Sequence, residues 1–410
     1  MRKTKTAKVV RNLAALAIIA GPLTAAMATN GYFSHGYGMK AKGMGGASVA
    51  MTDDAFAGAN NPAIAAWVGN RAELGLDFFM PSRESSNTGG ASAKSDSNLF
   101  YVPEFGYNRA INDKLGVGIT VYGNGGMNTD YPVNFFGGTP ALGVNLIQLI
   151  VAPTVAYKFS DKHSVGVSPL LVHQRFKAEG LSPFAGYSAS PGALTNNGYD
   201  TSNGIGVRLG YLGKINDKVT LGASYSPKIS MSKFSKYAGL FAEDGGFDIP
   251  ENYTLGASFQ ATPSVLFALD YQRIGYSGVR AISNPSGNLL LGKQLGAADG
   301  PGFGWSDINV WKVGVQWQAT PQLTMRGGVN VGDNPVQGRD VTFNILAPGV
   351  VTTHYTLGGT YALSDKTEVS FSYMYAPSNS VTGANLLNPA VQDTVKMSQQ
   401  ALGIQFGWRY

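Results

Sequence analysis

The sequence predicts an all-β protein: a 14-stranded antiparallel transmembrane barrel with an N-terminal plug in its lumen. Three observations support this fold class: a short export signal, strands that alternate apolar and polar side chains, and tight turns that alternate with long loops. Charged residues make up 14% of the chain, whereas soluble domains carry about 25%. Low charge with 54 glycines and 11% aromatic residues is typical of strands that face lipid on one side and a lumen on the other.

Residues 1–28 are predicted to be a signal peptide. Residues 2–11 carry five basic side chains, residues 13–20 form a short apolar core, and Ala26-Met27-Ala28 is a small-x-small cleavage site. The apolar run is too short for a transmembrane helix, which needs about 20 residues. Without those five basic residues, 26 basic and 25 acidic residues remain, so the basic pI gives no support for a nucleic-acid partner. The chain has no cysteine, which excludes disulfides and thiolate chemistry.

The barrel is predicted over residues 71–410. In residues 401–410, Leu, Ile, Phe, Trp and Tyr occupy every second position, with small or polar residues and one arginine between them. This period of two puts one apolar face toward lipid and one polar face toward the lumen. The predicted strands are 71–80, 98–110, 114–123, 148–159, 163–177, 203–215, 218–231, 250–261, 264–276, 307–319, 322–331, 350–363, 366–376 and 397–410.

Tight turns separate these strands in pairs. Asn, Asp and Pro set hairpin turns through their own backbone chemistry. They recur in Asn-Asp-Lys, Ser-Asp-Lys and Ala-Thr-Pro sequences at 111–114, 160–162, 215–218, 261–263, 319–321 and 364–366. Longer segments rich in Gly, Ser, Asn and Pro lie between them. Six tight turns and seven long loops give an even strand count, with both ends of the barrel on the periplasmic side of an outer membrane.

Residues 29–70 precede the first strand and do not alternate. They are rich in Gly, Ala, Asn and Met, which makes them too apolar for a free tail. A disordered periplasmic tail is the alternative. We favour a plug, because a barrel of this strand count has a wide lumen.

A resemblance to a known family follows from this segment. The Gly-rich stretch Gly43 to Ala47, then Asp53-Asp54, then Asn61-Pro62-Ala63, resembles the start of the FadL family of outer-membrane transporters. The motif covers about thirty residues, whereas the shared architecture covers the whole mature chain. The resemblance implies capture of hydrophobic molecules on extracellular loops, a lumen pocket and a movable plug. It also implies a kink in the third strand that lets cargo leave sideways into the bilayer.

Residues 124–147 are predicted to be one long apolar loop that captures ligand or packs against its neighbours; both interpretations remain open. An exposed apolar patch of this size usually has a function. The candidate capture residues are Met127, Tyr131, Phe135, Phe136, Leu142 and Leu146. Just before them, Gly123, Gly125 and Gly126 permit a strand kink, or they mark an ordinary strand-to-loop transition.

The cargo and its pocket are predicted more coarsely. Tyr32 and Phe33 lie close enough to the mature N-terminus to reach a lumen pocket. A fatty-acid carboxylate needs a cationic partner, for which Arg175, Lys177 and Arg208 are the candidates. Long-chain fatty acids are the first hypothesis, an aromatic hydrocarbon channel is the second, and a general porin or adhesion barrel is the third.

Other functions find little support. Four histidines are present, none of them in a recognisable nucleophile motif, and His173 and His354 are predicted to face the lumen. No metal-ligand cluster or phosphate-binding Gly-Lys-Ser/Thr loop appears, so we expect no metal, no cofactor and no enzyme activity. The expected partners are a hydrophobic small molecule and the outer-membrane lipid and lipopolysaccharide around a monomer.

Overall fold

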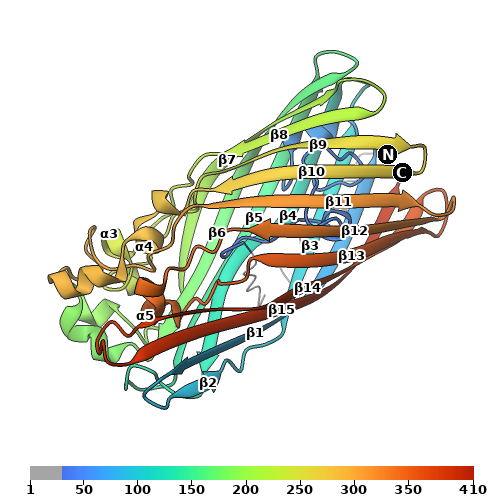
Figure 1. Ribbon diagram of the computed structural model, residues 1–410. Helices are drawn as coiled ribbons and strands as arrows, with labels where there is room; N and C mark the ends of the chain where they lie inside the picture. The colour runs from blue at the N-terminus through green and yellow to red at the C-terminus, as the bar shows by residue number, and fades with distance from the viewer. Residues whose placement is uncertain (1–29) are drawn as a thin grey trace, which may run out of the picture.

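The computed structural model describes residues 30–410, in which 14 long strands close into one antiparallel barrel (Figure 1). Consecutive strands pair throughout, and β1 pairs with β15 to close the sheet. This confirms the predicted fold and strand number; the predicted signal peptide lies outside the described residues. The barrel strands are β1 (Arg71–Asn87), β3 (Phe100–Ala110), β4 (Leu115–Tyr131), β5 (Leu142–Lys158), β6 (His163–Glu179), β7 (Asp200–Lys214), β8 (Val219–Ser226), β9 (Asn252–Thr262), β10 (Val265–Ile274), β11 (Ile308–Gln318), β12 (Leu323–Gly332), β13 (Thr353–Ala362), β14 (Thr367–Ala384) and β15 (Gln392–Arg409).

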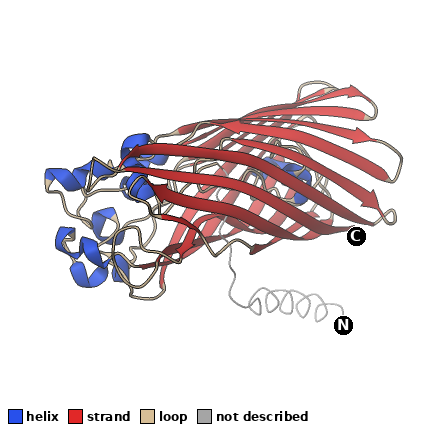
Figure 2. Cartoon of the chain, turned by 60° about the horizontal axis from the view of Figure 1, so that its bottom comes forward, coloured by secondary structure: helices blue, strands red, loops and turns tan. Residues whose placement is uncertain are grey.

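Short elements complete the fold. The strand β2 (Ser92–Lys94) pairs with β1 alone. Figure 2 shows most helices gathered at one end of the barrel. The helices are α2 (Met39–Lys42), α3 (Ala242–Gly245), α4 (Arg280–Ser283), α5 (Val341–Asn344), η1 (Pro62–Ala66), η2 (Ser182–Tyr187), η3 (Pro191–Ala193), η4 (Ser235–Tyr237), η5 (Tyr276–Gly278), η6 (Ser286–Leu291) and η7 (Gly338–Asp340). Among residues 30–410, no helix has the length and hydropathy needed to cross a bilayer.

The strands form because their alternation matches the two faces of the wall. On β15, Leu402, Ile404 and Phe406 are exposed on the outer surface, whereas Ala401 and Gln405 are buried inside. The outer face is therefore a band of large apolar side chains, as a lipid-facing surface requires.

The two ends of the barrel differ. At the turn end, the side chain of Asn112 accepts hydrogen bonds from the backbone N–H groups of Lys114 and Leu115, and Asn216 does the same for Lys218 and Val219. These asparagines fix the tight turns locally. At the loop end, the long connections fold over the barrel and carry α3, α4 and α5 (Figure 1).

One predicted loop is wrong. Residues 124–131 continue β4 and residues 142–147 belong to β5, so the connection between them covers only 132–141. Residues 122–129 are all buried, because both faces of this stretch are covered. A strand covered on both faces loses the period of two by which strands are recognised. The strands β1, β14 and β15 also extend further toward the loop end than predicted, and β8 ends five residues earlier, at Ser226.

Residues 30–70, hereafter the inner segment, run inside the ring of strands (Figure 1). Most of them are buried, and their polar groups bond to inward-facing residues of the wall. The backbone N–H of Gly45 donates to Thr356 on β13, for example, and that of Gly58 donates to Thr120 on β4. The inner segment therefore fills the lumen toward the turn end, and the loops fill it toward the other end.

Candidate functional site

Ion pairs hold the inner segment at the turn end. The Nζ of Lys42, on α2, lies 2.8 Å from Asp77 of β1 and 2.6 Å from Glu104 of β3. Lys40 pairs with Glu368 at 2.7 Å, and Asp53 pairs with Arg326 at 3.1 Å. Breaking one partner of such a buried pair costs about 3–5 kcal/mol, because the other charge stays buried. Asp77 and Glu104 were not among the predicted site residues, although acidic residues at inward positions of two strands could have indicated an ion pair with the inner segment.

The motif residues of the inner segment make further local contacts. Asn61 caps η1: its Oδ1 accepts from the backbone N–H of Ala63 at 3.1 Å, and Pro62 occupies the first helical position. Its Nδ2 donates to the carbonyls of Val49 and Tyr211, at 2.7 and 2.8 Å. Asn61 therefore ties a turn of the inner segment to β7.

The carboxyl of Asp54 has an unusual environment. Its Oδ1 accepts from the backbone N–H of Phe56 at 3.0 Å, and the side chain is 8% exposed. Burial, together with the charges of Glu73 and Asp53, raises the pKa of Asp54 to about 8. The protonation of Asp54 therefore changes near neutral pH, next to the ion pairs that hold the inner segment.

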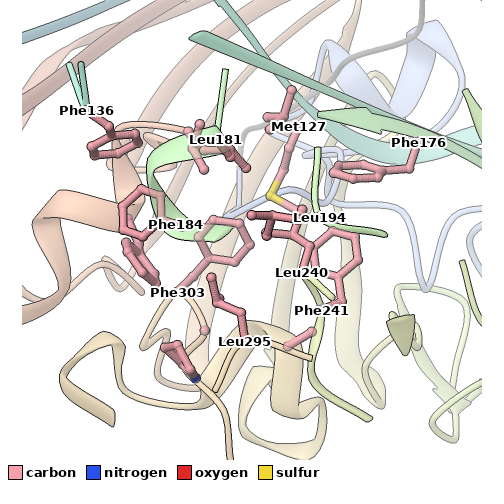
Figure 3. Close-up of a pocket in the computed structure, with 16 residues that line it drawn as sticks. Met127, Phe136, Phe176, Leu181, Phe184, Leu194, Leu240, Phe241, Leu295 and Phe303 are labelled. Carbon is pink, nitrogen blue, oxygen red and sulfur yellow. The ribbon is translucent and has the colours of Figure 1, made fainter. Parts of the chain in front are cut away.

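An apolar cavity, hereafter the outer cavity, lies among the loops at the loop end. It holds about 650 Å³ of space, its open mouth included. Figure 3 shows side chains from several loops pointing into this common space. All lining residues are apolar or glycine: Met127, Phe136, Val144, Phe176, Leu181, Phe184, Leu194, Leu240, Phe241, Ala281, Leu295, Pro301, Gly302, Phe303, Phe343 and Leu346. Such a site suits a molecule without charge, or the apolar part of an amphiphile.

The predicted capture residues divide into two groups. Met127 and Phe136 line the outer cavity. Leu142 and Leu146 are fully buried on β5, and Tyr131 packs edge-on against Phe135 with 5.3 Å between ring centroids. Most of the lining comes from loops far away in the sequence, and no local sequence pattern marks the convergence of these loops.

Tyr32 and Phe33 lie in an aromatic cluster inside the barrel. The ring of Tyr32 lies 5.2 Å from that of Phe33, 5.5 Å from Tyr276 and 6.2 Å from Trp305. The hydroxyl of Tyr276 accepts from the backbone N–H of Tyr32 at 3.1 Å and donates to the carbonyl of Asn30 at 2.5 Å. The start of the inner segment is thus packed against the loops rather than paired with charges.

A bulge interrupts β4 beside this cluster. The register with β5 shifts between Gly123 and Gly125, so Asn124 is the extra residue. The ladder between β3 and β4 stops at the pair Phe105–Val121. Beyond it, the inner segment bonds to β4 instead: Gly126 N–H donates to the carbonyl of Tyr32 and Ser34 N–H to that of Asn124, both at 3.2 Å.

This contact requires a glycine. A Cβ at position 125 would lie 1.8 Å from the carbonyl oxygen of Tyr32, so no other residue allows the two backbones to approach in this way. A second cavity, hereafter the inner cavity, lies beside the bulge and holds about 310 Å³ of space, its open mouth included. Its lining includes Phe79, Arg83, Gly126, Met127 and Trp305. Met127 lines both cavities, so the two cavities lie next to each other.

Of the predicted cationic residues, Arg208 lies in the lumen as expected, whereas Arg175 does not. Arg208 faces the lumen, where its Nη1 donates to the carbonyls of Gly58 and Ala59 and to the hydroxyl of Tyr122. It therefore holds the inner segment. Arg175 lies at an outward position of β6, over the ring of Tyr199 at 3.6 Å, so its predicted place in the lumen is wrong. A strand alternates its faces at every residue, so Gln174 and Phe176 are buried where Arg175 is not.

Three other predicted side chains can be placed. Lys177, also at an outward position, pairs with Glu179 at 2.8 Å. His173 is exposed on the outer face and bonds to Asn203, contrary to its predicted lumen position. His354 is fully buried on β13, as expected of a lumen-facing residue. In residues 30–410, no group of three or more His, Cys, Asp or Glu side chains is arranged to hold a metal ion.

Comparisons with known proteins agree with the barrel. The family model "Outer membrane protein transport protein (OMPP1/FadL/TodX)" matches residues 15–410. The toluene transporter TodX of P. putida is 21% identical, with a TM-score of 0.69 over 92% of this chain and 99% of that chain. A FadL homologue of Pseudomonas aeruginosa is 16% identical, with a TM-score of 0.70 over the same shares. The toluene transporter TbuX of Ralstonia pickettii is 20% identical, with a TM-score of 0.65, again over 92% and 99%. No curated protein sequence matches this chain.

Proposed function

Because the chain belongs to the OMPP1/FadL/TodX family of outer-membrane transport proteins, which carry hydrophobic substrates, we propose that its cargo is long-chain fatty acids. The observation that carries this proposal is the pair of adjacent cavities that share Met127: one is wholly apolar, and the other is apolar apart from Arg83 and Asn128. An alkyl chain fits the first environment and a polar head fits the second. The protein is an outer-membrane barrel, with its turn end in the periplasm and its loop end outside the cell.

The cavities also support a path. Cargo enters the outer cavity from the extracellular side, passes Met127 and reaches the inner cavity beside Gly126. There the β3–β4 ladder is interrupted, and the inner segment bonds to the backbone of β4 at Asn124 and Gly126 instead. Displacement of residues 32–34 frees this part of the wall, so cargo leaves sideways into the bilayer. Movement is by diffusion, without a cofactor or a catalytic step, through a monomer surrounded by lipid and lipopolysaccharide.

Uptake in cells tests the cargo. A Gram-negative host without its own fatty-acid channel is supplied with the full chain and given radiolabelled oleate or toluene. We expect oleate uptake to rise well above that of the empty host. If toluene enters faster and oleate does not, the cargo is the aromatic class that the names of TodX and TbuX indicate for those proteins.

Conductance in planar bilayers tests the plug. The intact chain is expected to show little steady conductance, because buried contacts hold the inner segment in the lumen. Deletion of residues 30–70 should give a large open channel. A large, steady conductance of the intact chain would instead identify a general pore.

A further inference from the structure

Arg83 is a buried cation whose hydrogen bonding is incomplete. It lies on β1, is 3% exposed, and lines the inner cavity. Its Nη1 donates to the backbone carbonyl and the side-chain oxygen of Asn128, whereas Nε and Nη2 have no hydrogen-bond partner. Within residues 30–410, no carboxylate lies within ion-pair distance of this guanidinium, whereas Lys42 has two such partners and Arg326 has one.

The unpaired edge has a defined shape. Nε and Nη2 are the two nitrogens on one side of a guanidinium, and their N–H groups match the two oxygens of a carboxylate. A buried charge without a partner is costly, so this edge calls for an anion. Two neighbouring groups have partners of their own: the Asp130 carboxylate accepts from Ser97 on the exposed side, and the Tyr131 hydroxyl bonds to Ser85.

The surroundings restrict the anion to an amphiphile. Apart from Arg83 and Asn128, the inner cavity is lined by glycine and apolar side chains, among them Phe79, Trp305 and Met397. The ring of Phe100 lies 5.5 Å from the Arg83 guanidinium carbon. A carboxylate at Arg83 therefore leaves an attached alkyl chain among apolar groups, next to Met127 and the outer cavity.

Lys312 is the competing candidate. It is buried in a polar cavity and, within residues 30–410, forms no ion pair or hydrogen bond. The carboxylate of Asp270 lines the same cavity, and its Oδ1 has no hydrogen-bond partner. A second carboxylate there would meet a like charge, which Arg83 does not impose.

We propose that Arg83 binds the carboxylate head group of a long-chain monocarboxylic acid and thereby selects this cargo over uncharged chains of equal length. The inference rests on the proposed function, because it names the residue that recognises the head group. It also places the head beside Gly126, where the β3–β4 ladder is interrupted.

The test compares binding of radiolabelled oleate and oleyl alcohol to the purified full chain in detergent. A charge-assisted hydrogen bond contributes about 1.5–3 kcal/mol, so oleate should bind roughly 10-fold to 100-fold more tightly than the alcohol. Arg83→Met should abolish this preference and leave alcohol binding within about twofold, whereas Arg83→Lys should keep part of it. Arg175→Met is the matched control, because that guanidinium lies on the outer face.

Two outcomes overturn the inference: equal binding of both ligands to the unsubstituted chain, or an undiminished oleate preference in Arg83→Met. Should Arg83→Met fail to fold, the unsubstituted chain is tested by ¹³C NMR with carboxyl-labelled oleate. A carboxylate bound to arginine titrates at lower pH than free oleate, and an unchanged titration would contradict the inference. If the unsubstituted chain binds and takes up oleate and the alcohol equally well, the role of Arg83 is wrong but the proposed transport stands. If the unsubstituted chain neither binds nor takes up either ligand, the proposed function itself is wrong.

Discussion

Replacement of Lys42 by methionine should release the inner segment while the barrel stays folded. The Lys42 ammonium lies between Asp77 and Glu104, at 2.8 and 2.6 Å, and the side chain is 1% exposed. Burial lowers the pKa of Lys42, but the two acids outweigh this and raise it to about 12, so the lysine is charged at neutral pH. Methionine keeps the volume of the side chain and leaves two carboxylates buried without a cation.

The magnitude follows from that loss. Removing one partner of a buried ion pair costs about 3–5 kcal/mol, which corresponds to a shift of roughly 150-fold to 5,000-fold in the equilibrium between docked and undocked segment. The strand ladders do not depend on Lys42, because β1 pairs with β3 and β15 through its backbone. The cost should therefore appear as local opening rather than as unfolding of the barrel.

Hydrogen exchange of residues 39–56 measures the opening, and planar-bilayer conductance measures its effect. Lys177→Met is the matched control, since its half-exposed pair with Glu179 is worth about 1 kcal/mol or less. Neutralising the two acids as well, in the triple variant with Asp77→Asn and Glu104→Gln, should restore much of the protection, because no buried charge then lacks a partner. The reasoning is refuted if Lys42→Met exchanges like the unsubstituted chain, or if the triple variant opens as readily as the single one.

Three further perturbations address other contacts of the inner segment. Gly125→Ala should separate residues 32–34 from β4, because its Cβ would lie 1.8 Å from a backbone oxygen, and oleate uptake should rise; Gly278→Ala, at an open position, should leave uptake unchanged. Asp54 has a raised pKa of about 8, so the stability it gives the docked segment is present at low pH and is lost as the pH rises toward 8. Proteolysis of the segment should therefore accelerate between pH 5 and 9, and Asp54→Asn should flatten that profile; an unchanged profile would contradict it. Asn61→Ala removes a helix cap and two further hydrogen bonds. Protection of the amides of residues 61–66 from hydrogen exchange should fall by about 2 kcal/mol, and exchange at the rates of the unsubstituted chain would contradict this.

The sequence was sufficient to predict those elements whose structure depends on neighbouring residues. The alternation in β15 and the asparagine turns at Asn112 and Asn216 depend on neighbouring residues alone, so the strand number could be predicted. The stretch 124–129 could not be recognised as strand, because the inner segment and the loops cover both of its faces. The face on which Arg175 lies depends on a register that a one-residue error reverses, and a sequence sets registers less sharply than it sets strands.

The site itself depends on contacts between distant segments. Arg83 lay beyond residue 80, where the first predicted strand ended, and the structure extends β1 past it. Its importance comes from the groups around it: no acid on β1, β2 or β4 reaches its Nε and Nη2. Whether a buried polar group lacks a hydrogen-bond partner depends on the folded chain, so no local sequence pattern predicts it. The lining of the outer cavity, from residues between 127 and 346, is hidden for the same reason.

The contacts of the inner segment are unevenly distributed, and this bears on how a plugged barrel can pass cargo. Its later part is fixed by the ion pairs of Lys40, Lys42 and Asp53 and by the three hydrogen bonds of Asn61. Its start, residues 30–34, is held by aromatic packing and a few backbone hydrogen bonds, two of them to the bulged part of β4. Regions with few strong contacts open locally at the lowest free-energy cost. Opening can therefore be confined to the start of the segment, beside the interrupted β3–β4 ladder, while the ion pairs keep the rest of the lumen closed to water-soluble compounds. Under the proposed function, such a division would let an apolar molecule leave through the wall without an aqueous pore across the membrane.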